Sequence, residues 1–209
     1  MASAVLAVAA LGACSGDGDS EAEDPTTTTA AVEGVDVALE PGAVTVFGVA
    51  DGAVLAESAA RAALVGAERY VQSAMVSPLA RGDVAERFTG LFAPALLPLV
   101  QSGGRDHAVL TDAGIPEATA TPSVTTSPVA IDALVATDGT PLMVVTAFRA
   151  RTNAETDEGP VSVGRTVELT FERTDGDWLV TAYKISTTRR GIDDSPTSTT
   201  SVDSEVDAA

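Results

Sequence analysis

The sequence has few of the residues on which metal and redox chemistry depend. Its 209 residues include one cysteine, Cys14, and one histidine, His107. A single cysteine excludes an intramolecular disulfide and any site built from several cysteines, and a lone histidine is most often a surface residue. The sequence also has no glycine-rich phosphate-binding loop, and the histidine is not near a nucleophile-elbow motif. We therefore expect no metal and no cofactor.

Basic residues are also scarce, and they are unevenly distributed. Twelve Lys and Arg residues stand against 30 Asp and Glu residues, which gives a formal net charge of −18. Residues 1–54 and 191–209 together contain fourteen acidic residues and no Lys or Arg. Such a charge repels nucleic acid and anionic lipid, so we expect no nucleic-acid partner. Acidic flanks of this kind are typical of solvated segments that do not fold.

The N-terminal stretch is apolar but short. Residues 1–13 are too few to cross a bilayer as a helix, and they have the length of a signal-peptide core. The stretch ends in Leu11-Gly12-Ala13-Cys14, which resembles the bacterial lipobox. The resemblance implies that Cys14 carries a lipid such as palmitate and that residues 1–13 are a signal peptide. We expect a lipoprotein at the outer face of the cell membrane. A secreted or cytoplasmic protein is the alternative if the lipobox is not used.

The remaining chain divides by composition into a folded part and two flanks. Residues 14–34 are acidic and Thr-rich and predict a disordered tether. Residues 35–52 contain two short alternating pieces around Pro41-Gly42 and predict an edge hairpin. Residues 53–188 predict the folded domain, and residues 189–209 predict a disordered acidic tail.

Helices are expected in the first half of the folded part. Residues 53–76 are rich in Ala, Leu, Glu and Arg, with apolar residues at three- and four-residue spacing. Pro78 should end this helix, because the residue before a proline resists helical dihedral angles. A second helix is expected from Asp83, which would be its N-cap with Glu86 as the capping-box partner.

Strands are expected in the second half. Apolar and polar residues alternate in four runs, and the Asp138-Gly139 and Asp175-Gly176 pairs between them suit tight hairpin turns. The two hairpins are expected over 129–135 with 142–151, and over 161–172 with 178–185. Helices followed by strands predict an α+β fold, with N-terminal helices packed on a curved antiparallel sheet of four or more strands.

This order of elements resembles the nuclear-transport-factor-two-like superfamily of cone-shaped α+β domains, and within it the domains of actinobacterial lipoproteins. The resemblance covers residues 53–187 and is carried by Ser77-Pro78-Leu79, Phe88, Phe92, Arg105-Asp106 before Leu110, and the 176–181 segment of the last hairpin. The superfamily includes isomerases, dehydratases and non-enzymatic modules, so the fold alone does not select a function.

The resemblance implies a cone with a pocket for a small apolar ligand. The residues expected to line it are Tyr70, Phe88, Phe92, Met143 and Trp178. The steroid-isomerase branch of the superfamily uses a tyrosine and a carboxylate inside the cone. An enzymatic role here would require Tyr70 to converge with a carboxylate such as Glu68 or Asp132.

Four arginines are expected on the strands: Arg149, Arg151, Arg165 and Arg173. Ion pairs with Glu168, Glu172 or Asp132 on a solvated sheet face are the ordinary interpretation. An anion-binding groove is the alternative.

Three functions remain open from the sequence. The first is a non-catalytic interaction or accessory module, with a protein partner or a homodimer formed through the sheet face. The second is a carrier or sensor for a small apolar ligand, and the third is an isomerase- or dehydratase-like enzyme. The absence of catalytic motifs favours the first.

Overall fold

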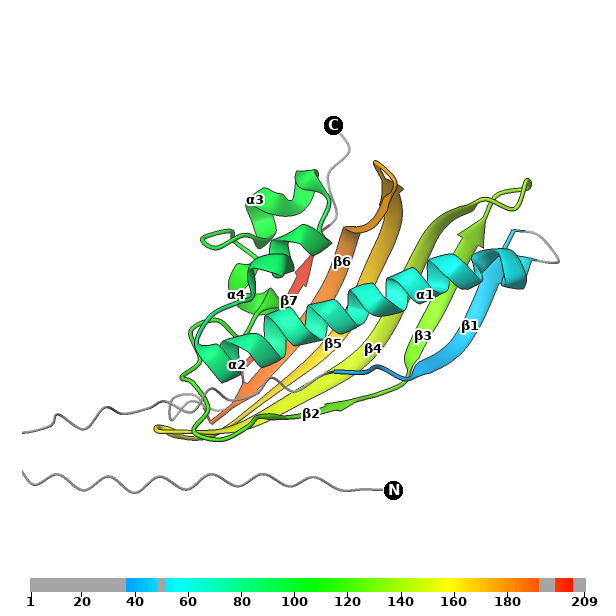
Figure 1. The fold of residues 1–209 in the computed structure, drawn as a ribbon. Coiled ribbons are helices and arrows are strands. Elements are labelled where there is room, and N and C mark those ends of the chain that lie inside the picture. The colour runs from blue at the N-terminus through cyan, green and yellow to red at the C-terminus, as the bar shows by residue number, and fades with distance from the viewer. Residues whose placement is uncertain (1–36, 49–51, 192–197, 205–209) are drawn as a thin grey trace, which may run out of the picture. The chain divides into compact units, whose positions relative to one another are not determined.

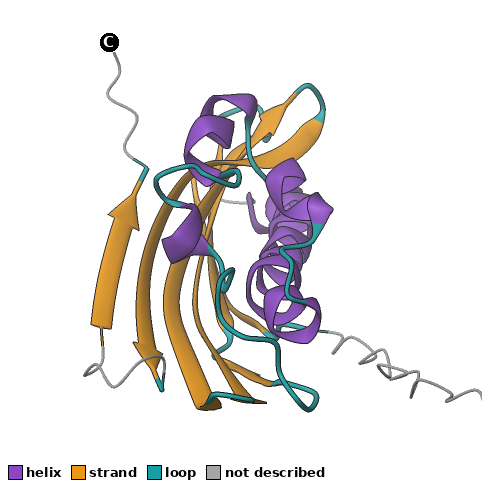
Figure 2. Ribbon diagram, turned by 90° about the vertical axis from the view of Figure 1, so that its left-hand side faces the viewer, coloured by secondary structure: helices purple, strands orange, loops and turns teal. Residues whose placement is uncertain are grey.

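A seven-stranded sheet carries the fold, and helices pack on one of its two faces (Figures 1 and 2). The computed structural model describes residues 37–48, 52–191 and 198–204. Chain contacts divide the protein into Met1–Ala31 and Val32–Ala209, and every described residue belongs to the second unit. The α+β class expected from the sequence is confirmed for this unit.

The expected signal peptide, Cys14 and the tether lie outside the described residues. Within the described ranges, no helix combines the length and the apolar character needed to cross a membrane.

The sheet has the strand order β1-β3-β4-β5-β6-β7, and β2 pairs with the far part of β4 beyond the end of β3. The strands are β1 (Pro41–Phe47), β2 (Ser123–Thr126), β3 (Val129–Val135), β4 (Pro141–Thr156), β5 (Gly159–Thr174), β6 (Asp177–Arg190) and β7 (Ser198–Asp203).

The two expected hairpins are confirmed, and they form the middle of the sheet. β3 pairs with β4, and β5 pairs with β6, both antiparallel. Asp175 and Gly176 both have positive φ (53° and 99°), as a two-residue turn of the hairpin type requires. Along β4 and β5 one side chain is buried and the next is exposed, so each strand has one face in the core and one in solvent.

The first strand differs from the expected edge hairpin over 35–52. Residues Pro41–Phe47 form one strand that runs parallel to β3, so the sheet is mixed and not purely antiparallel. Pro41-Gly42 makes no turn there. A Cβ on Gly42 would lie 3.0 Å from the carbonyl oxygen of Val129, so the glycine allows the two backbones to approach closely. This segment therefore pairs with the open edge of β3 as a parallel strand.

The tail also differs from expectation. Residues 189–209 were expected to be disordered, but β6 extends to Arg190 and residues 198–203 form β7 on its edge. The Tyr183 N–H donates to the Ser204 hydroxyl (2.7 Å), and the Ser204 N–H donates to the Tyr183 carbonyl (3.0 Å). Val202 packs against the core. The free edge of β6 supplies the hydrogen-bond partners that the isolated tail lacks.

One long helical segment crosses the inner face of the sheet (Figure 1). It consists of α1 (Gly52–Tyr70), a π-helical stretch (Val71–Val76) and α2 (Ser77–Arg81). The expected end at Pro78 is wrong by one turn, because Pro78 lies in the first turn of α2, where no helical N–H bond is required. Gly82, with φ of 73°, ends the helix in the left-handed conformation.

The following segments are short. They are two 3₁₀ helices, Glu86–Leu91 and Pro94–Leu96, and two one-turn helices, α3 (Leu97–Val100) and α4 (His107–Leu110). The expected second α-helix is therefore a 3₁₀ helix, and its N-cap position is Ala85 with no side-chain cap, instead of Asp83.

Candidate functional site

Three of the five residues expected to line an apolar pocket are packed into the core. Tyr70, Phe88 and Phe92 are buried, with ring centroids 6.4 Å apart for Tyr70–Phe88 and 5.1 Å for Phe88–Phe92. Trp178 is half-buried against the same core. Met143 lies on the opposite face of the sheet, since its neighbour Val144 points into the core. The five side chains therefore do not share one cavity.

The tyrosine and carboxylates required for an isomerase-like site do not converge either. The Tyr70 hydroxyl donates to the Leu110 carbonyl (2.8 Å), and burial raises the pKa of Tyr70. Glu68 instead accepts the N–H of Leu39 (3.1 Å). Asp132 is exposed on β3, whose apolar residues Ile131 and Ala133 face the core. Tyr70 and Asp132 thus lie on opposite faces of the sheet.

A buried ion pair lies beneath the helices. Asp112 Oδ1 and Arg165 Nη2 are 2.6 Å apart, and both side chains have no solvent exposure. The Thr152 hydroxyl donates to Asp112 Oδ2 (3.3 Å). Burial is the largest single effect and lowers the pKa of the Arg165 guanidinium, but the charge and hydrogen bond of Asp112 together with the nearby Tyr70 outweigh it, so the pKa rises. The pair fixes the segment after α4 to β4 and β5.

Further bonds attach the same segment to β6. Arg165 Nε donates to the Val109 carbonyl and to the Thr187 hydroxyl, both at 3.1 Å, and Thr187 also donates to Val109 (2.8 Å). Arg189 donates to the Ala108 carbonyl and, at 3.0 Å, to that of Thr111. Burial and the nearby Arg165 charge lower the pKa of Arg189. These groups bond to one another and to backbone, except Arg165 Nη1 and Arg189 Nε, which have no hydrogen-bond partner among the described residues, so the arrangement serves mainly structure.

A second buried contact joins α4 to the end of the sheet. The Tyr183 hydroxyl donates to Asp106 Oδ2 (2.6 Å), and Arg105 Nε lies 3.2 Å from Asp106 Oδ1. Burial, then the hydrogen bond with Asp106, raise the pKa of Tyr183. His107 Nδ1 lies 2.8 Å from the Val100 carbonyl. Among the described residues no group of three His, Cys, Asp or Glu side chains is arranged to hold a metal ion.

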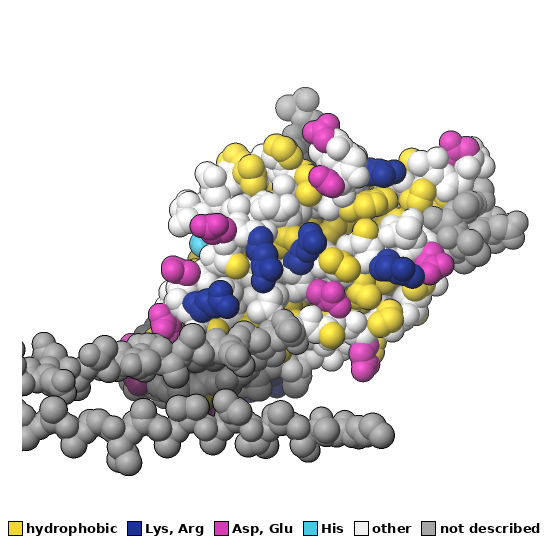
Figure 3. Space-filling model, viewed as in Figure 1, with side chains coloured by type: hydrophobic (Ala, Val, Ile, Leu, Met, Phe, Trp, Pro, Cys, Tyr) yellow, Lys and Arg dark blue, Asp and Glu magenta, His cyan; other side chains and the backbone are white. Residues whose placement is uncertain are grey.

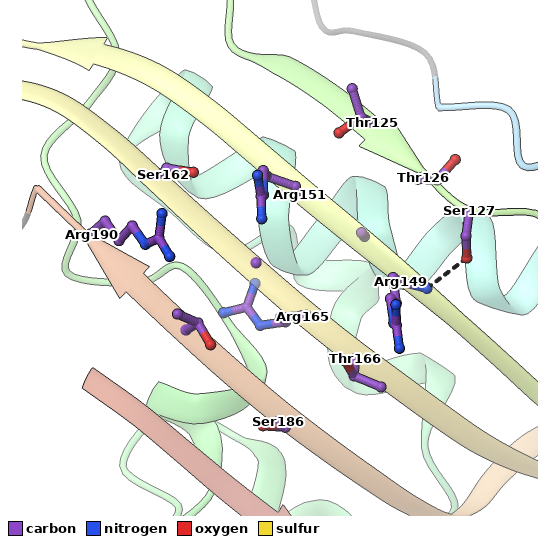
Figure 4. A pocket seen from close by; sticks show the side chains of 13 residues that line it. Thr125, Thr126, Ser127, Arg149, Arg151, Ser162, Arg165, Thr166, Ser186 and Arg190 are labelled. Atoms are coloured by element: carbon purple, nitrogen blue, oxygen red, sulfur yellow. Dashed lines mark hydrogen bonds between the residues drawn. The ribbon is translucent and has the colours of Figure 1, made fainter. Parts of the chain in front are cut away.

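The uncovered face of the sheet has a different character. A groove of about 440 Å³ crosses β2, β4, β5 and β6 (Figure 4). Arg149 and Arg151 on β4 and Arg190 on β6 line it, together with seven Ser and Thr residues. No acidic and no aromatic residue is part of the lining. We call this the arginine groove. Arg165 also borders it, but its side chain is buried and paired with Asp112.

The pairing of the strands arranges the arginine groove in three rows, each with one arginine. The rows are Arg149–Thr166–Ser186, Arg151–Gly164–Thr188 and Asn153–Ser162–Arg190. The Arg149 N–H donates to the Ser127 hydroxyl of the β2–β3 connection (2.9 Å), which holds this side of the groove. Gly164, in the middle row, has no side chain, and a Cβ there would have only Arg151 Nε nearby, at 3.9 Å. The groove is thus hollow at its centre.

Within the part of the chain that the structure describes, the three arginines of the groove have no acidic partner. The ion pairs of the described residues are Glu57–Arg61, Arg105–Asp106 and Asp112–Arg165. The ordinary interpretation of paired charges on the sheet is therefore wrong for Arg149 and Arg151. On the helix-covered face, by contrast, basic and acidic side chains are interspersed with apolar ones (Figure 3).

Two smaller hollows continue the arginine groove along the strands. One, of about 350 Å³, shares Ser162 and Arg190 with it and contains Glu155. The other, of about 320 Å³, shares Arg149 and Thr166 with it and contains Glu168. Each end of the basic region is thus marked by one glutamate.

The sequence contained part of the signal for the buried Asp112–Arg165 pair and for the arginine groove. Arg165 falls in phase with Val163 and Val167, so an arginine was visible among core positions. Gly164 falls in the exposed phase, where a strand residue with no side chain leaves a hollow. Arg190 was missed because it was assigned to the tail.

These features define an α+β domain with a structural polar interior and an open basic groove on the bare face of its sheet. No protein-family model, no curated protein and no solved structure matches the chain.

Proposed function

We propose that the protein is a non-catalytic recognition module, held at the outer face of the cell membrane by a lipid on Cys14, and that it binds its partner through the arginine groove. One observation carries the proposal. Three arginines, which have no acidic partner among the described residues, line an open groove on an exposed sheet face, in a chain of net charge −18. In so acidic a protein, a basic region free of acids attracts anionic groups specifically to that face.

The arrangement of the polar groups supports a binding role over a catalytic one. Nucleophilic and acid–base catalysis need a reactive side chain next to a base and a space for substrate. Here the buried tyrosines Tyr70 and Tyr183 bond to a backbone carbonyl and to Asp106, away from the groove. The groove itself offers guanidinium and hydroxyl groups, which bind and orient anions.

The proposal includes two further elements from the sequence. The lipobox-like segment ending at Cys14, followed by an acidic stretch, supports a tether that holds the domain clear of the membrane surface. The helix-covered sheet is consistent with a cone-like domain of the nuclear-transport-factor-two-like kind, a superfamily that includes non-enzymatic modules.

The tether is tested with labelled palmitate. We expect incorporation into the wild-type chain and none into Cys14→Ala, with the label in the membrane fraction. Label in both chains, or in neither, contradicts the anchoring.

The recognition role is tested by crosslinking on intact membranes. We expect a crosslinked product with the wild type that is lost in Arg149→Ala/Arg151→Ala and kept in Arg87→Ala. Arg87 is an exposed arginine in the 3₁₀ helix Glu86–Leu91 and controls for lost charge. A product that survives the double substitution removes the groove as the binding face, and a product of twice the chain mass identifies a homodimer.

A further inference from the structure

The geometry of the arginine groove indicates which anions it can hold. Side chains two residues apart on one strand face lie about 7 Å apart, and neighbouring strands lie about 4.8 Å apart. Arg149 and Arg151 are separated by one such step along β4. Arg190 lies one row further and two strands across, on the other side of β5 (Figure 4). Anionic groups spaced along a chain match these separations, whereas one small anion would require all three long side chains to converge on it.

The acidic residues set the length of the site. The rows of Arg149, Arg151 and Asn153 contain no Asp or Glu on the groove face. The next row on one side pairs Glu168 with Lys184 and has no net charge, and the next row on the other side contains Glu155. Three rows at about 7 Å intervals span roughly 14 Å between the first and the last. An anionic chain is therefore attracted over that distance, gains no net attraction from the neutral Glu168–Lys184 row and is repelled by Glu155 at the other end.

The lining also indicates the backbone that carries the anions. Single-stranded nucleic acid is bound by a basic groove together with aromatic side chains on which its bases stack, and the lining of this groove has no aromatic residue. Seven Ser and Thr residues offer hydroxyl groups that donate and accept hydrogen bonds. Such a surface suits a ligand that is itself rich in hydroxyl groups.

We infer that the arginine groove binds a short stretch of a linear polyanion, with two or three phosphate-diester or carboxylate groups on a polyol or sugar backbone, lying along β4 and β5. This inference rests on the proposed recognition role of the groove and specifies its ligand. Each guanidinium binds one anionic group through charge-assisted hydrogen bonds, and the ligand backbone crosses the hollow at Gly164.

The test uses the full-length chain with Cys14→Ser, which cannot be acylated, and titration calorimetry at fixed salt. The probes are oligo(glycerol phosphate) and oligogalacturonate of one to six units, which separate phosphate from carboxylate as the source of charge. Neutral dextran, inorganic phosphate and single-stranded DNA of equal charge are the comparison ligands. We expect affinity for at least one oligomer series to rise with length up to about three anionic groups and then level off, because the row beyond Arg149 is neutral and the row beyond Asn153 contains Glu155.

Two substitutions separate a shaped site from diffuse charge. Arg151→Ala should weaken oligomer binding at least tenfold, whereas Arg87→Ala, with the same loss of charge, should change it less than twofold. Gly164→Val retains every arginine and fills the hollow. The nearest atom to its Cβ would be Arg151 Nε at 3.9 Å, and valine suits a strand, so the fold should be kept or stabilised. We expect this variant also to lose binding at least tenfold with no fall in melting temperature.

Several results overturn the inference. They are binding that keeps rising with length, DNA of equal charge binding as tightly as the oligomers, inorganic phosphate matching them, or Gly164→Val binding like the wild type. Absence of binding by both oligomer series overturns it as well. If a membrane partner is nevertheless crosslinked and the crosslink requires Arg151, the proposed recognition role is supported and only the inferred ligand class is wrong. If Cys14 incorporates no palmitate, the proposed lipid anchor is wrong and the inferred ligand class is unaffected.

Discussion

The backbone N–H of Asp112 donates to the carbonyl oxygen of Ala74, at 2.8 Å. In a regular α-helix that oxygen accepts from the residue four positions on, which here is Pro78 and has no N–H. The proline therefore leaves an acceptor in the helix that the segment after α4 uses. This bond holds Asp112 where its carboxylate meets Arg165. One residue thus shapes the helix and positions the buried ion pair.

The Asp112–Arg165 pair should dominate the stability of this region. Arg165→Met leaves the buried Asp112 carboxylate without its partner, so we expect the free energy of unfolding to fall by about 3–5 kcal/mol. Asp112→Leu/Arg165→Met removes both charges and should recover at least half of that loss. Urea unfolding followed by circular dichroism measures both. A single variant within about 1 kcal/mol of the wild type would show that the pair is not critical.

Stability should fall at alkaline pH because of the buried tyrosines. Folding raises the pKa of Tyr70 above its ordinary value near 10, so the folded state favours the neutral phenol. This contribution is complete below pH 10 and is lost as pH rises toward the folded-state pKa, by up to about 1.4 kcal/mol per pH unit.

The variant Tyr70→Phe tests this pH dependence. It should lose about 1–2 kcal/mol at pH 8 with its hydrogen bond to Leu110, and should show a shallower decline between pH 10 and 11. Urea unfolding at each pH gives the slopes, and Tyr183→Phe reports the second tyrosine. Equal slopes in Tyr70→Phe and the wild type would assign the decline to other groups.

Gly66 sets the distance between α1 and the sheet. A Cβ at this position would lie 2.5 Å from Cε1 of Phe171, a stiff ring in the core. Overpacking of this kind costs about 1–3 kcal/mol, which should exceed the helix propensity gained, so we expect Gly66→Ala to lower the melting temperature. Gly90 has no atom within 4 Å of such a Cβ, so Gly90→Ala is the matched control and should be neutral or stabilising. Equal melting temperatures for the two variants would contradict this prediction.

The strand β7 protects the edge of β6. A chain that ends at Gly191 lacks β7 and exposes the β6 backbone from Lys184 to Arg189, and open edges of this length pair with other chains. We expect this variant to self-associate with rising concentration in sedimentation velocity, while the full chain does not. If the truncated and full-length chains sediment alike, β7 is not needed to prevent association through the β6 edge.

Local sequence patterns predicted the helix and strands whose formation depends on residues close together in the chain. Alternation along 161–172 and the Asp175-Gly176 pair predicted a hairpin, because strand burial repeats every second residue and the turn needs positive φ. The apolar stripe over 53–76 predicted the long helix for the same reason. The α+β class followed from the order of these elements.

The features that local patterns did not predict depend on distant partners. Residues 198–203 become a strand because β6 offers an open edge, and the expected hairpin over 35–52 is instead one strand paired with β3, which no local pattern shows. The helix passes Pro78 because α2 starts there and Asp112 uses the freed carbonyl. In the candidate site, too, the residue types could be predicted from the sequence, but their arrangement could not. The four strand arginines were visible in the sequence, but pairing across β4, β5 and β6 decided that Arg165 is buried and that Arg149, Arg151 and Arg190 share a groove.

The sequence by itself determined the long helix and the two central hairpins of this protein, because hydrophobic periodicity and turn chemistry act between near neighbours. Only the tertiary structure decided which charges are buried, which face of the sheet stays bare and which arginines lie together. Those outcomes depend on strand register and on contacts between residues far apart in the chain, where a shift of one residue would move each side chain to the other face.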